Sequence, residues 1–141
     1  MAVDFVGAKV ALFCGSAVLT CQRDDRPGLP WPGLWDLPGG GREGDEGPEA
    51  CLLRELHEEF GLHFGPDRLI WRREFPSMLD ATRLSVFFGG HLTLAEVASI
   101  RFGDEGQGWA LMPVAEFLAH GAAVPEMQRR MGIVWDEIGP F

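Results

Sequence analysis

Residues 39–62, GGGREGDEGPEACLLRELHEEFGL, contain the pattern that decides the fold. Three glycines lead through a loop to Pro48, which suits the first turn of a helix because its missing N–H needs no partner there. Residues 50–60 contain no helix breaker, and Gly61 follows where helices commonly end in the left-handed conformation. The stretch therefore predicts a loop, a helix and a second loop.

The helix predicted over residues 50–60 has two chemically different faces. Apolar residues recur on it at steps of three and four, which indicates a stripe that faces the core. The residues of this stripe are Leu53, Leu56 and Phe60. Glu55, Glu58 and Glu59 fall within an arc of about 100° elsewhere on the helix. A hard divalent cation would remove their repulsion, whereas most acidic pairs simply face solvent, so the glutamates alone leave both interpretations open.

The remainder of the chain predicts strands and helices within one domain that spans residues 1–141. Strands are predicted over residues 5–13, 16–22, 34–37, 68–75, 82–92 and 109–112, and further helices over 113–120 and 125–131. The glycines at 39–41 are expected to stop the strand that precedes them. Strands, a helix and then mixed strands are typical of a layered α/β (α+β) domain.

The composition is that of a globular protein, with 46% hydrophobic and 23% charged residues. A net charge of −9 repels the backbone of DNA and RNA, so a long nucleic-acid partner is not expected. The three cysteines cannot all pair within one chain and have no CxxC spacing, which favours a reduced, cytoplasmic protein. No signal peptide is expected, because the first residues lack its basic start and apolar run. No membrane span is expected either, because no apolar run approaches roughly 18 residues.

The spacing within residues 40–62 resembles the box of the Nudix hydrolases at every specified position. The pattern is Gly40, five residues, Glu46, seven residues, Arg54-Glu55-Leu56, one residue, Glu58-Glu59, one residue, Gly61-Leu62. Seven fixed residues match by chance about once in 10⁹ windows, at about 5% usage per residue type. The resemblance implies an α/β/α sandwich around a mixed β-sheet, whose loop–helix–loop box holds magnesium or manganese.

The resemblance also implies a role for individual box residues. Glu55, Glu58 and Glu59 match the metal-facing glutamates of the family, and Gly39 matches a position whose backbone carbonyl can reach the metal. Arg54 matches an arginine that pairs with the box carboxylates and fixes their geometry for catalysis. The positions with a structural role are Gly40, Glu46 and Gly61.

Glu105-Gly106-Gln107 is a second local resemblance, to the Glu-Gly-Gln loop of MutT-like members. In those members the loop glutamate supplies a further carboxylate, so Glu105 becomes a metal ligand and the second candidate for general base, after Glu55. An exposed turn would explain the same three residues. The MutT-like enzymes that read oxidised guanine use an asparagine near the C-terminus, but this chain contains no asparagine. Recognition of the base by that residue is therefore impossible here.

Substrate contacts are less clearly marked in the sequence. The candidates are Arg23 for phosphate, Trp35 and Phe75 for stacking on a base, and Gln107 for an amide contact. Trp31, Trp109, Arg26 and Arg42 are open to the same interpretations. Aromatic residues more often belong to the core, and exposed arginines often only solubilise a surface.

The sequence therefore predicts a metal-dependent hydrolase of a small nucleotide. We expect a nucleoside triphosphate pyrophosphohydrolase that acts on canonical or oxidised nucleotides, with a nucleoside diphosphate sugar or ADP-ribose as the alternative substrate. A non-catalytic Nudix domain that senses a ligand is the alternative of another class. Such domains usually carry a damaged box or a second domain, and the box of this chain is intact.

Overall fold

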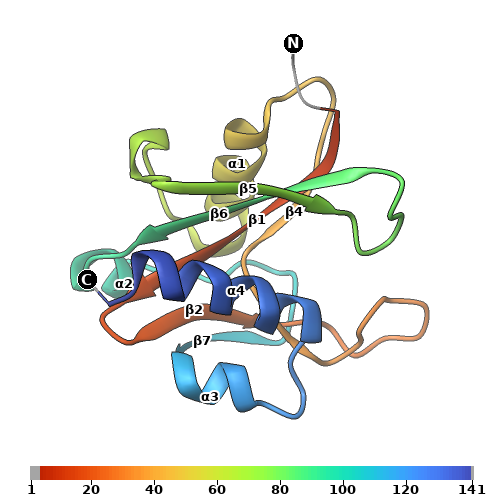
Figure 1. Ribbon diagram of the computed structural model, residues 1–141. Helices are drawn as coiled ribbons and strands as arrows, with labels where there is room; N and C mark the ends of the chain where they lie inside the picture. Colours follow the sequence, from red (N-terminus) through yellow and green to blue (C-terminus); the bar gives the residue numbers. More distant parts are fainter. Residues whose placement is uncertain (1–3, 141) are drawn as a thin grey trace.

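β1 (Phe5–Cys14) is the central strand of a mixed sheet in the computed structural model, which describes residues 4–140 (Figure 1). It pairs in parallel with β6 (Leu84–His91) and, through a turn at Gly15, in antiparallel with β2 (Ala17–Gln22). The remaining strands are β3 (Trp35–Asp36), β4 (Gly39–Gly41), β5 (Trp71–Pro76) and β7 (Gly108–Pro113). The strand order is β3-β2-β1-β6-β5, with β4 beside β1 and β7 beside β2.

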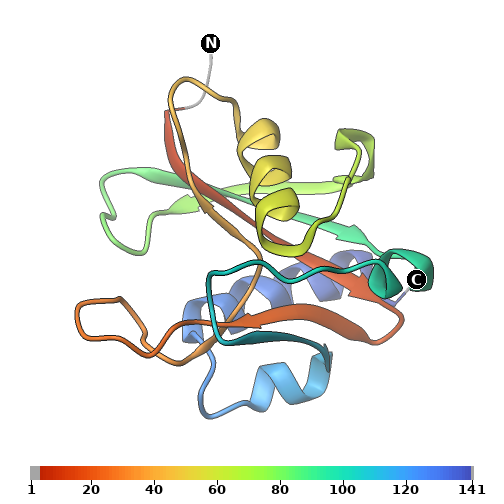
Figure 2. The ribbon, with the colours of Figure 1, turned by 180° about the vertical axis from the view of Figure 1, so that it is seen from behind.

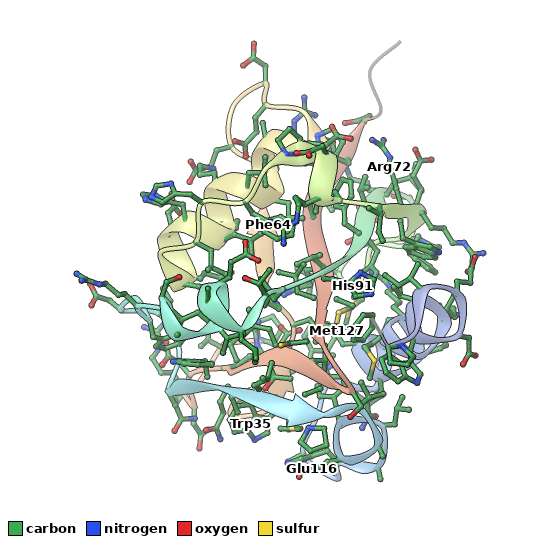
Figure 3. All side chains as sticks on the ribbon, turned by 90° about the vertical axis from the view of Figure 1, so that its left-hand side faces the viewer. Trp35, Phe64, Arg72, His91, Glu116 and Met127 are labelled. Atoms are coloured by element: carbon green, nitrogen blue, oxygen red, sulfur yellow. The ribbon has the colours of Figure 1, made fainter. Side chains whose placement is uncertain are left out.

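Helices α1 (Pro48–Phe60) and α4 (Pro125–Ile138) cover opposite faces of this sheet, as the front and back views show (Figures 1 and 2). Because successive side chains of a strand point to opposite faces, Leu12 joins the core cluster on the α1 side and Phe13 the cluster on the α4 side. Met127 fills the space between α4 and the sheet (Figure 3). The predicted α/β/α sandwich with a mixed sheet is confirmed.

β1 and β2 separate beyond their shared turn and form a fork. They pair next to the turn, where Phe13 lies opposite Val18. Farther along, residues 35–41 fill the gap, because β3 pairs with the end of β2 and β4 pairs with the first half of β1. The Val10 N–H donates to the Pro38 carbonyl at 3.0 Å inside the fork. The fork therefore carries the start of the Nudix-like box into the centre of the sheet.

Helix α1 begins and ends as the sequence predicts. Pro48 lies in its first turn, and Gly61 ends it with a φ of +67° while donating its N–H to the His57 carbonyl. The buried residues of the helix are Cys51, Leu52, Leu56 and Phe60. Leu53, predicted for the core stripe, is only partly buried. Leu52 is buried in addition to the predicted positions, because α1 packs on both β1 and β4.

Two helices depart from the sequence prediction. α4 continues past residue 131 to Ile138, because Gly132 is accommodated within the helix and Val134 prolongs its buried face. A short helix, α2 (Leu94–Ala98), was not predicted, although Thr93 and Glu96 form a capping box at its start. The other short elements are α3 (Val114–Ala119) and a 3₁₀ turn (Pro66–Arg68).

The helices and the cysteines bear on two expectations from the composition. Within residues 4–140, no helix combines the length and apolar character needed to cross a membrane. The three cysteines are free thiols, with Cys51 buried and the other two partly buried.

Candidate active site

The three glycines of the box form the strand β4 and let the helix approach the sheet closely. They were predicted to stop a strand, but they pair with β1 instead, with Gly39 opposite Lys9. Gly39 has a φ of +133°, and a Cβ there would overlap the Ala8 carbonyl and lie 2.6 Å from the Lys9 Cα. A Cβ on Gly40 would lie 2.6 Å from the Glu55 Cδ. Glycine is therefore required where β4 separates β1 from the acidic face of α1.

Glu59 is the most enclosed carboxylate of that face. The Gly39 N–H donates to its Oε1 at 2.9 Å. Burial raises the pKa of Glu59 to about 7, against the opposing influence of the Lys9 ammonium and the Gly39 N–H. Burial of a carboxylate favours its neutral form unless a cation compensates. Glu59 is thus a partly buried acid that a further positive charge would hold in its ionised form.

Glu55 lies closer to solvent but faces the same space, with its side chain 13% exposed. Burial raises its pKa, the hydrogen bond from Arg54 lowers it, and the charges of Glu58 and Glu105 raise it further. The influence of Glu105 shows that this loop residue lies within electrostatic reach of the helix. Both Glu55 and Glu105 line one cavity, although they are far apart in the sequence.

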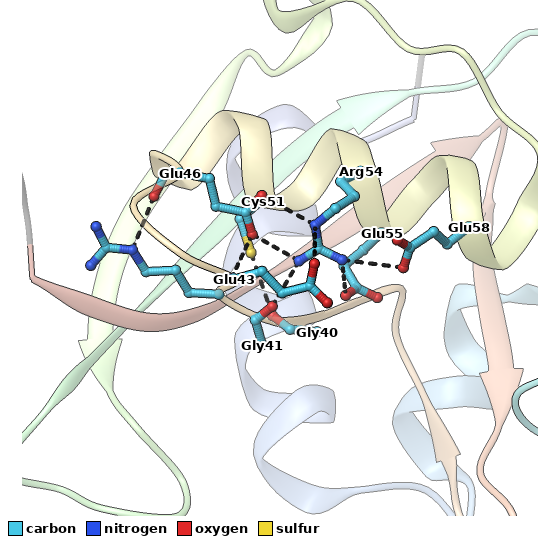
Figure 4. Close-up of polar contacts among 9 residues, drawn as sticks. Gly40, Gly41, Glu43, Glu46, Cys51, Arg54, Glu55 and Glu58 are labelled. Carbon is cyan, nitrogen blue, oxygen red and sulfur yellow. Dashed lines mark hydrogen bonds and ion pairs between the residues drawn. The ribbon is translucent and has the colours of Figure 1, made fainter.

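Arg54 organises the outer side of the helix (Figure 4). Its Nε and Nη2 donate to the two carboxylate oxygens of Glu46 at 3.1 and 2.8 Å, which is a bidentate pair. Its Nη1 donates to Glu55 at 2.8 Å and to Glu58 at 3.1 Å, and Nη2 also reaches the Gly41 carbonyl at 2.9 Å. The arginine thus joins the loop to the helix, as the family resemblance implies.

Glu46 and Glu58 differ in how firmly Arg54 holds them. The hydrogen bond from Arg54 is the main reason that the pKa of Glu46 falls to about 2. The Glu43 N–H also donates to Glu46 at 2.8 Å, which fixes the turn of the box. Glu58 is 55% exposed, and its carboxylate accepts a hydrogen bond from the Arg54 guanidinium. Glu58 is therefore free to turn toward a ligand, whereas Glu46 is part of the scaffold.

A cavity of about 750 Å³ opens beside β4 and the fork. Glu55, Glu59 and Glu105 line one part of it, and Arg23 and Lys9 line the adjoining part. An apolar region continues the cavity toward α4. Residues that line this region are Leu29, Trp31, Met78, Leu79, Val124 and Met127. The cavity thus combines carboxylates, cations and an apolar wall, within the size range of sites for small ligands.

The structure separates the four candidate substrate residues. Arg23 lines the cavity. Trp35 lies on strand β3, with its ring 6.4 Å from that of His120 (Figure 3), and Phe75 is buried against Phe87. Neither aromatic residue is among the cavity residues, because the pleat turns both toward the core. Gln107 is exposed, and its side chain donates to the Arg23 carbonyl at 2.9 Å, which stabilises the loop next to the cavity.

Lys9 and Asp36 did not stand out in the sequence, whereas Trp31 was a candidate for stacking on a base. Lys9 and Asp36 form an ion pair of 3.1 Å inside the fork. Lys9 could have been noticed in the sequence, because it is the one charged residue in the otherwise apolar strand predicted over residues 5–13. Trp31 lines the apolar part and has a φ of +47°, the only positive φ among the non-glycine residues at 4–140. No local pattern predicted that conformation.

The donors around the cavity suit a hard divalent cation, which prefers carboxylate and carbonyl oxygens. Two glutamates on the cavity wall, Glu55 and Glu59, have pKa values raised first of all by burial, as expected for carboxylates that lack a compensating charge. Among residues 4–140, no three His, Cys, Asp or Glu side chains already converge in a metal-binding arrangement. Different hydrogen-bond partners hold two of these carboxylates, because Arg54 donates to Glu58 and the Gly39 N–H donates to Glu59.

Comparisons with known proteins place this geometry in a family. The sequence model of the NUDIX domain matches residues 5–131. The chain is 37% identical over 75 residues to the nucleoside triphosphatase NudI of Escherichia fergusonii, which covers 52% of this chain and 49% of that protein. It is 47% identical over 47 residues to the RNA pyrophosphohydrolase of Gluconacetobacter diazotrophicus, which covers 31% of this chain and 28% of that protein. The matched part is thus less than half the length of either relative.

A solved structure has the same fold over nearly the whole chain. It is a bifunctional NMN adenylyltransferase/ADP ribose pyrophosphatase from Francisella tularensis, complexed with AMP and a manganese ion. The TM-score is 0.71 at 19% sequence identity, and the alignment covers 99% of this chain and 43% of that one. Together with the glycine strand, the acidic helix and the arginine that joins them, these matches show that the chain belongs to the Nudix family.

Proposed function

We propose that this chain hydrolyses a phosphoanhydride bond in a free nucleoside triphosphate, with a divalent cation as cofactor. The observation that carries the proposal is the cavity in which Glu55, Glu59 and Glu105 adjoin the cations of Lys9 and Arg23. Carboxylates can hold a metal ion there while the cations contact phosphate oxygens. The net charge of −9 favours a small substrate over a long RNA.

Glu55, Glu58 and Glu59 would hold the cation, with Glu105 and the Gly39 carbonyl as further oxygen donors. Magnesium or manganese bound there supplies charge that polarises phosphoryl oxygens and lowers the pKa of a bound water. The side chain of Glu58 has the freedom to turn inward because solvent surrounds more than half of it. Arg54 holds Glu55 in place through its hydrogen bond at 2.8 Å.

Glu55 is our first candidate for the general base, and Glu105 is the second. A base must accept a proton from the attacking water, which requires a carboxylate near the phosphate with a pKa not far below the working pH. Burial raises the pKa of Glu55 above its ordinary value, which is the direction that this role favours. Glu105 lines the same cavity from a loop and supplies an alternative acceptor.

The nucleobase would occupy the apolar part of the cavity, where Trp31 and Met78 offer flat or adaptable contacts. Val124 lies at the start of α4, in the region where the MutT-like enzymes that read oxidised guanine carry their asparagine. Its apolar side chain cannot form hydrogen bonds with a base. The NudI relative bears a name that refers to nucleoside triphosphates, which supports this substrate class.

The test compares kcat/KM for dGTP, oxidised dGTP, CTP, ADP-ribose, a GDP-sugar and a capped RNA at one magnesium concentration. We expect a triphosphate to lead the panel by at least about tenfold, which corresponds to about 1.4 kcal/mol of transition-state discrimination. EDTA should abolish turnover, and magnesium or manganese should restore it. Full activity in metal-free buffer contradicts the metal assignment, and a lead by ADP-ribose or the GDP-sugar contradicts the substrate class.

The same panel tests the non-catalytic alternative. A ligand sensor would bind one member of the panel, measured by calorimetry with magnesium present, and release no phosphate, pyrophosphate or nucleotide. Glu105→Gln separates the two candidate bases, because unchanged turnover and unchanged metal dependence in that variant would remove Glu105 from the site.

A further inference from the structure

Asp36 is a buried carboxylate at the centre of the fork between β1 and β2, and it is 4% exposed. Its Oδ1 accepts the Leu37 N–H at 2.7 Å. Its Oδ2 accepts hydrogen bonds from the Lys9 ammonium at 3.1 Å and from the Arg23 guanidinium at 3.2 Å. Both oxygens of the carboxylate therefore accept hydrogen bonds within the protein, and Oδ2 accepts from both cations.

Two cations share this one carboxylate. Burial alone would lower the pKa of Lys9, but the charges of Asp36, Cys21 and Glu59 raise it above its usual value, so the ammonium stays charged. Glu59 acts on Lys9 through charge, while its own Oε1 accepts the Gly39 N–H. If Lys9 served only to neutralise Asp36, Arg23 would be redundant. The pair of cations therefore exceeds what Asp36 alone requires.

Both cations retain donors for a ligand. Lys9 also donates to the Leu37 carbonyl at 3.1 Å, which accounts for two of the three hydrogens of an ammonium. Arg23 uses Nε for the Pro30 carbonyl at 2.9 Å and Nη1 for Asp36, which leaves its other donors unassigned among residues 4–140. Both side chains are about one quarter exposed and line the cavity.

We infer that Lys9 and Arg23, positioned by Asp36, bind an anionic phosphate of the substrate beside the carboxylates of the box. The inference rests on the proposed function and deepens it, because it names the part of the substrate that decides selectivity. A nucleoside triphosphate carries one more phosphate than a nucleoside diphosphate sugar, whose corresponding part is a neutral ring. Two fixed cations favour the former, because the neutral ring of the latter offers no anionic partner to their remaining donors.

The positions of the three residues in the fold explain why the site is rigid. Lys9 lies on the central strand, Asp36 on the short strand inside the fork, and Arg23 directly after β2. The two cations therefore reach Asp36 from both strands of the fork, Lys9 from β1 and Arg23 from the end of β2. Because the ordering occurs on folding, binding a phosphate costs less side-chain entropy than at an exposed lysine or arginine.

The first experiment measures binding without catalysis. Inorganic triphosphate is titrated by calorimetry into the protein in EDTA at low ionic strength, so that the result does not depend on metal or turnover. We expect Lys9→Met and Arg23→Met each to weaken binding at least about tenfold. The matched control is Arg72→Met, which removes an arginine that pairs with Glu49 outside the cavity and should leave binding unchanged. Equal binding by all variants, or no binding by the wild type, overturns the inference.

The second experiment measures selectivity. In Lys9→Met, KM for the preferred triphosphate should rise at least about tenfold while kcat/KM for a GDP-sugar changes less than about threefold. Asp36→Asn should act in the same direction through both cations, and Lys9→Arg should recover part of the loss. Equal losses on both substrates, or a fall in kcat alone, would assign Lys9 a merely structural role.

The two experiments separate this inference from the proposed function. If the wild type prefers a sugar nucleotide but still binds inorganic triphosphate through Lys9, the substrate proposal fails and the phosphate site stands. Lys9→Met keeps a partner for Asp36 in Arg23, and a thermal melt checks its fold. If that variant does not fold, Arg23→Met, which removes a partly exposed side chain, decides the binding test.

Discussion

Two charged clusters lie on either side of the glycine strand β4, and they differ in the ratio of cations to carboxylates. In the outer cluster, the single cation of Arg54 pairs with four carboxylates, which are Glu43, Glu46, Glu55 and Glu58. In the inner cluster, two cations, Lys9 and Arg23, pair with Asp36 beside Glu59. The outer cluster has an excess of negative charge near solvent, whereas the inner cluster has as many cations as carboxylates inside the fork.

The difference shows how burial decides what a carboxylate does. Glu46 and Glu59 belong to the same box, yet Arg54 lowers the pKa of Glu46 to about 2 whereas burial raises that of Glu59 to about 7. The arginine thus keeps a scaffold carboxylate ionised well below neutral pH. A carboxylate placed for a cation lacks a full compensating positive charge, which the bound cation would supply.

The largest expected effect comes from closing the space between the clusters. Gly39→Ala should lower the free energy of unfolding by about 4 kcal/mol, because of its positive φ and the overlap of a Cβ with Ala8. Gly41→Ala is the matched control, since the nearest atom to its Cβ would be the Val6 carbonyl oxygen at 3.9 Å. Urea unfolding measures both variants. Equal stabilities would mean that β4 need not approach β1 so closely.

The next effect is on catalysis. Glu58→Gln and Glu59→Gln should each lower kcat/KM about 100-fold, because each removes a charged oxygen donor. Neither should lower stability by more than about 0.5 kcal/mol, since Glu58 is an exposed partner and a glutamine at 59 still accepts the Gly39 N–H. Glu116→Gln on α3 is the control for an exposed glutamate outside the cavity (Figure 3). A large loss of melting temperature with normal turnover would make either residue structural.

The pH dependence of stability should have opposite slopes for the two clusters in metal-free buffer. Between pH 2 and 4.5 the unfolded chain holds the Glu46 proton more tightly, so the stability from Glu46 is full above pH 4.5 and disappears as the pH falls toward 2. Between pH 4.5 and 7 the folded chain holds the Glu59 proton more tightly, so stability falls as the pH rises through that window.

Matched variants isolate these slopes. The difference in unfolding free energy between the wild type and Glu46→Gln should change only on the acid side of pH 4.5. The corresponding difference for Glu59→Gln should change between pH 4.5 and 7. If both differences are flat over their windows, the two carboxyl groups titrate alike and the contrast between the clusters is wrong.

The smallest effect is expected at the rim of the outer cluster. The Glu43 carboxylate lies 3.5 Å from the Arg54 Nε and is 70% exposed. Glu43→Gln should change stability by less than about 0.5 kcal/mol, and added salt should remove the difference because exposed pairs are screened. A salt-independent loss above 1 kcal/mol, on the scale of a buried contact, would contradict this ranking.

Local patterns predicted the box and the helix that carries it. Pro48 and Gly61 mark the ends of α1 through backbone chemistry that does not depend on the rest of the fold. The acidic side of the helix follows from its period, and the Nudix resemblance assigned Glu55, Glu58 and Glu59 their expected roles. The hydrogen bonds of Arg54 to Glu46, Glu55 and Glu58 agree with the pairing that the resemblance implied.

Features that depend on distant partners could not be predicted in the same way. The glycines at 39–41 form a strand only because β1 and β2 separate, and no local property of glycine specifies that pairing. Phe75 appeared suitable for stacking on a base, but the register of β5 with β6 turns it into the core. Lys9 and Asp36 are 27 residues apart and meet only inside the fork.

The parallel pairing of β1 with β6 also affects how the chain reaches this fold. Phe5 lies opposite Leu84 and Phe13 opposite His91, so the central strand meets this neighbour only after most of the chain has been synthesised. Pairings of such large sequence separation slow folding, because the entropy of closing the intervening chain is lost before the contacts form. Until then, the apolar strand that later divides the two cores is exposed to other chains. We therefore expect refolding yield to fall with rising protein concentration, even where the native state is stable.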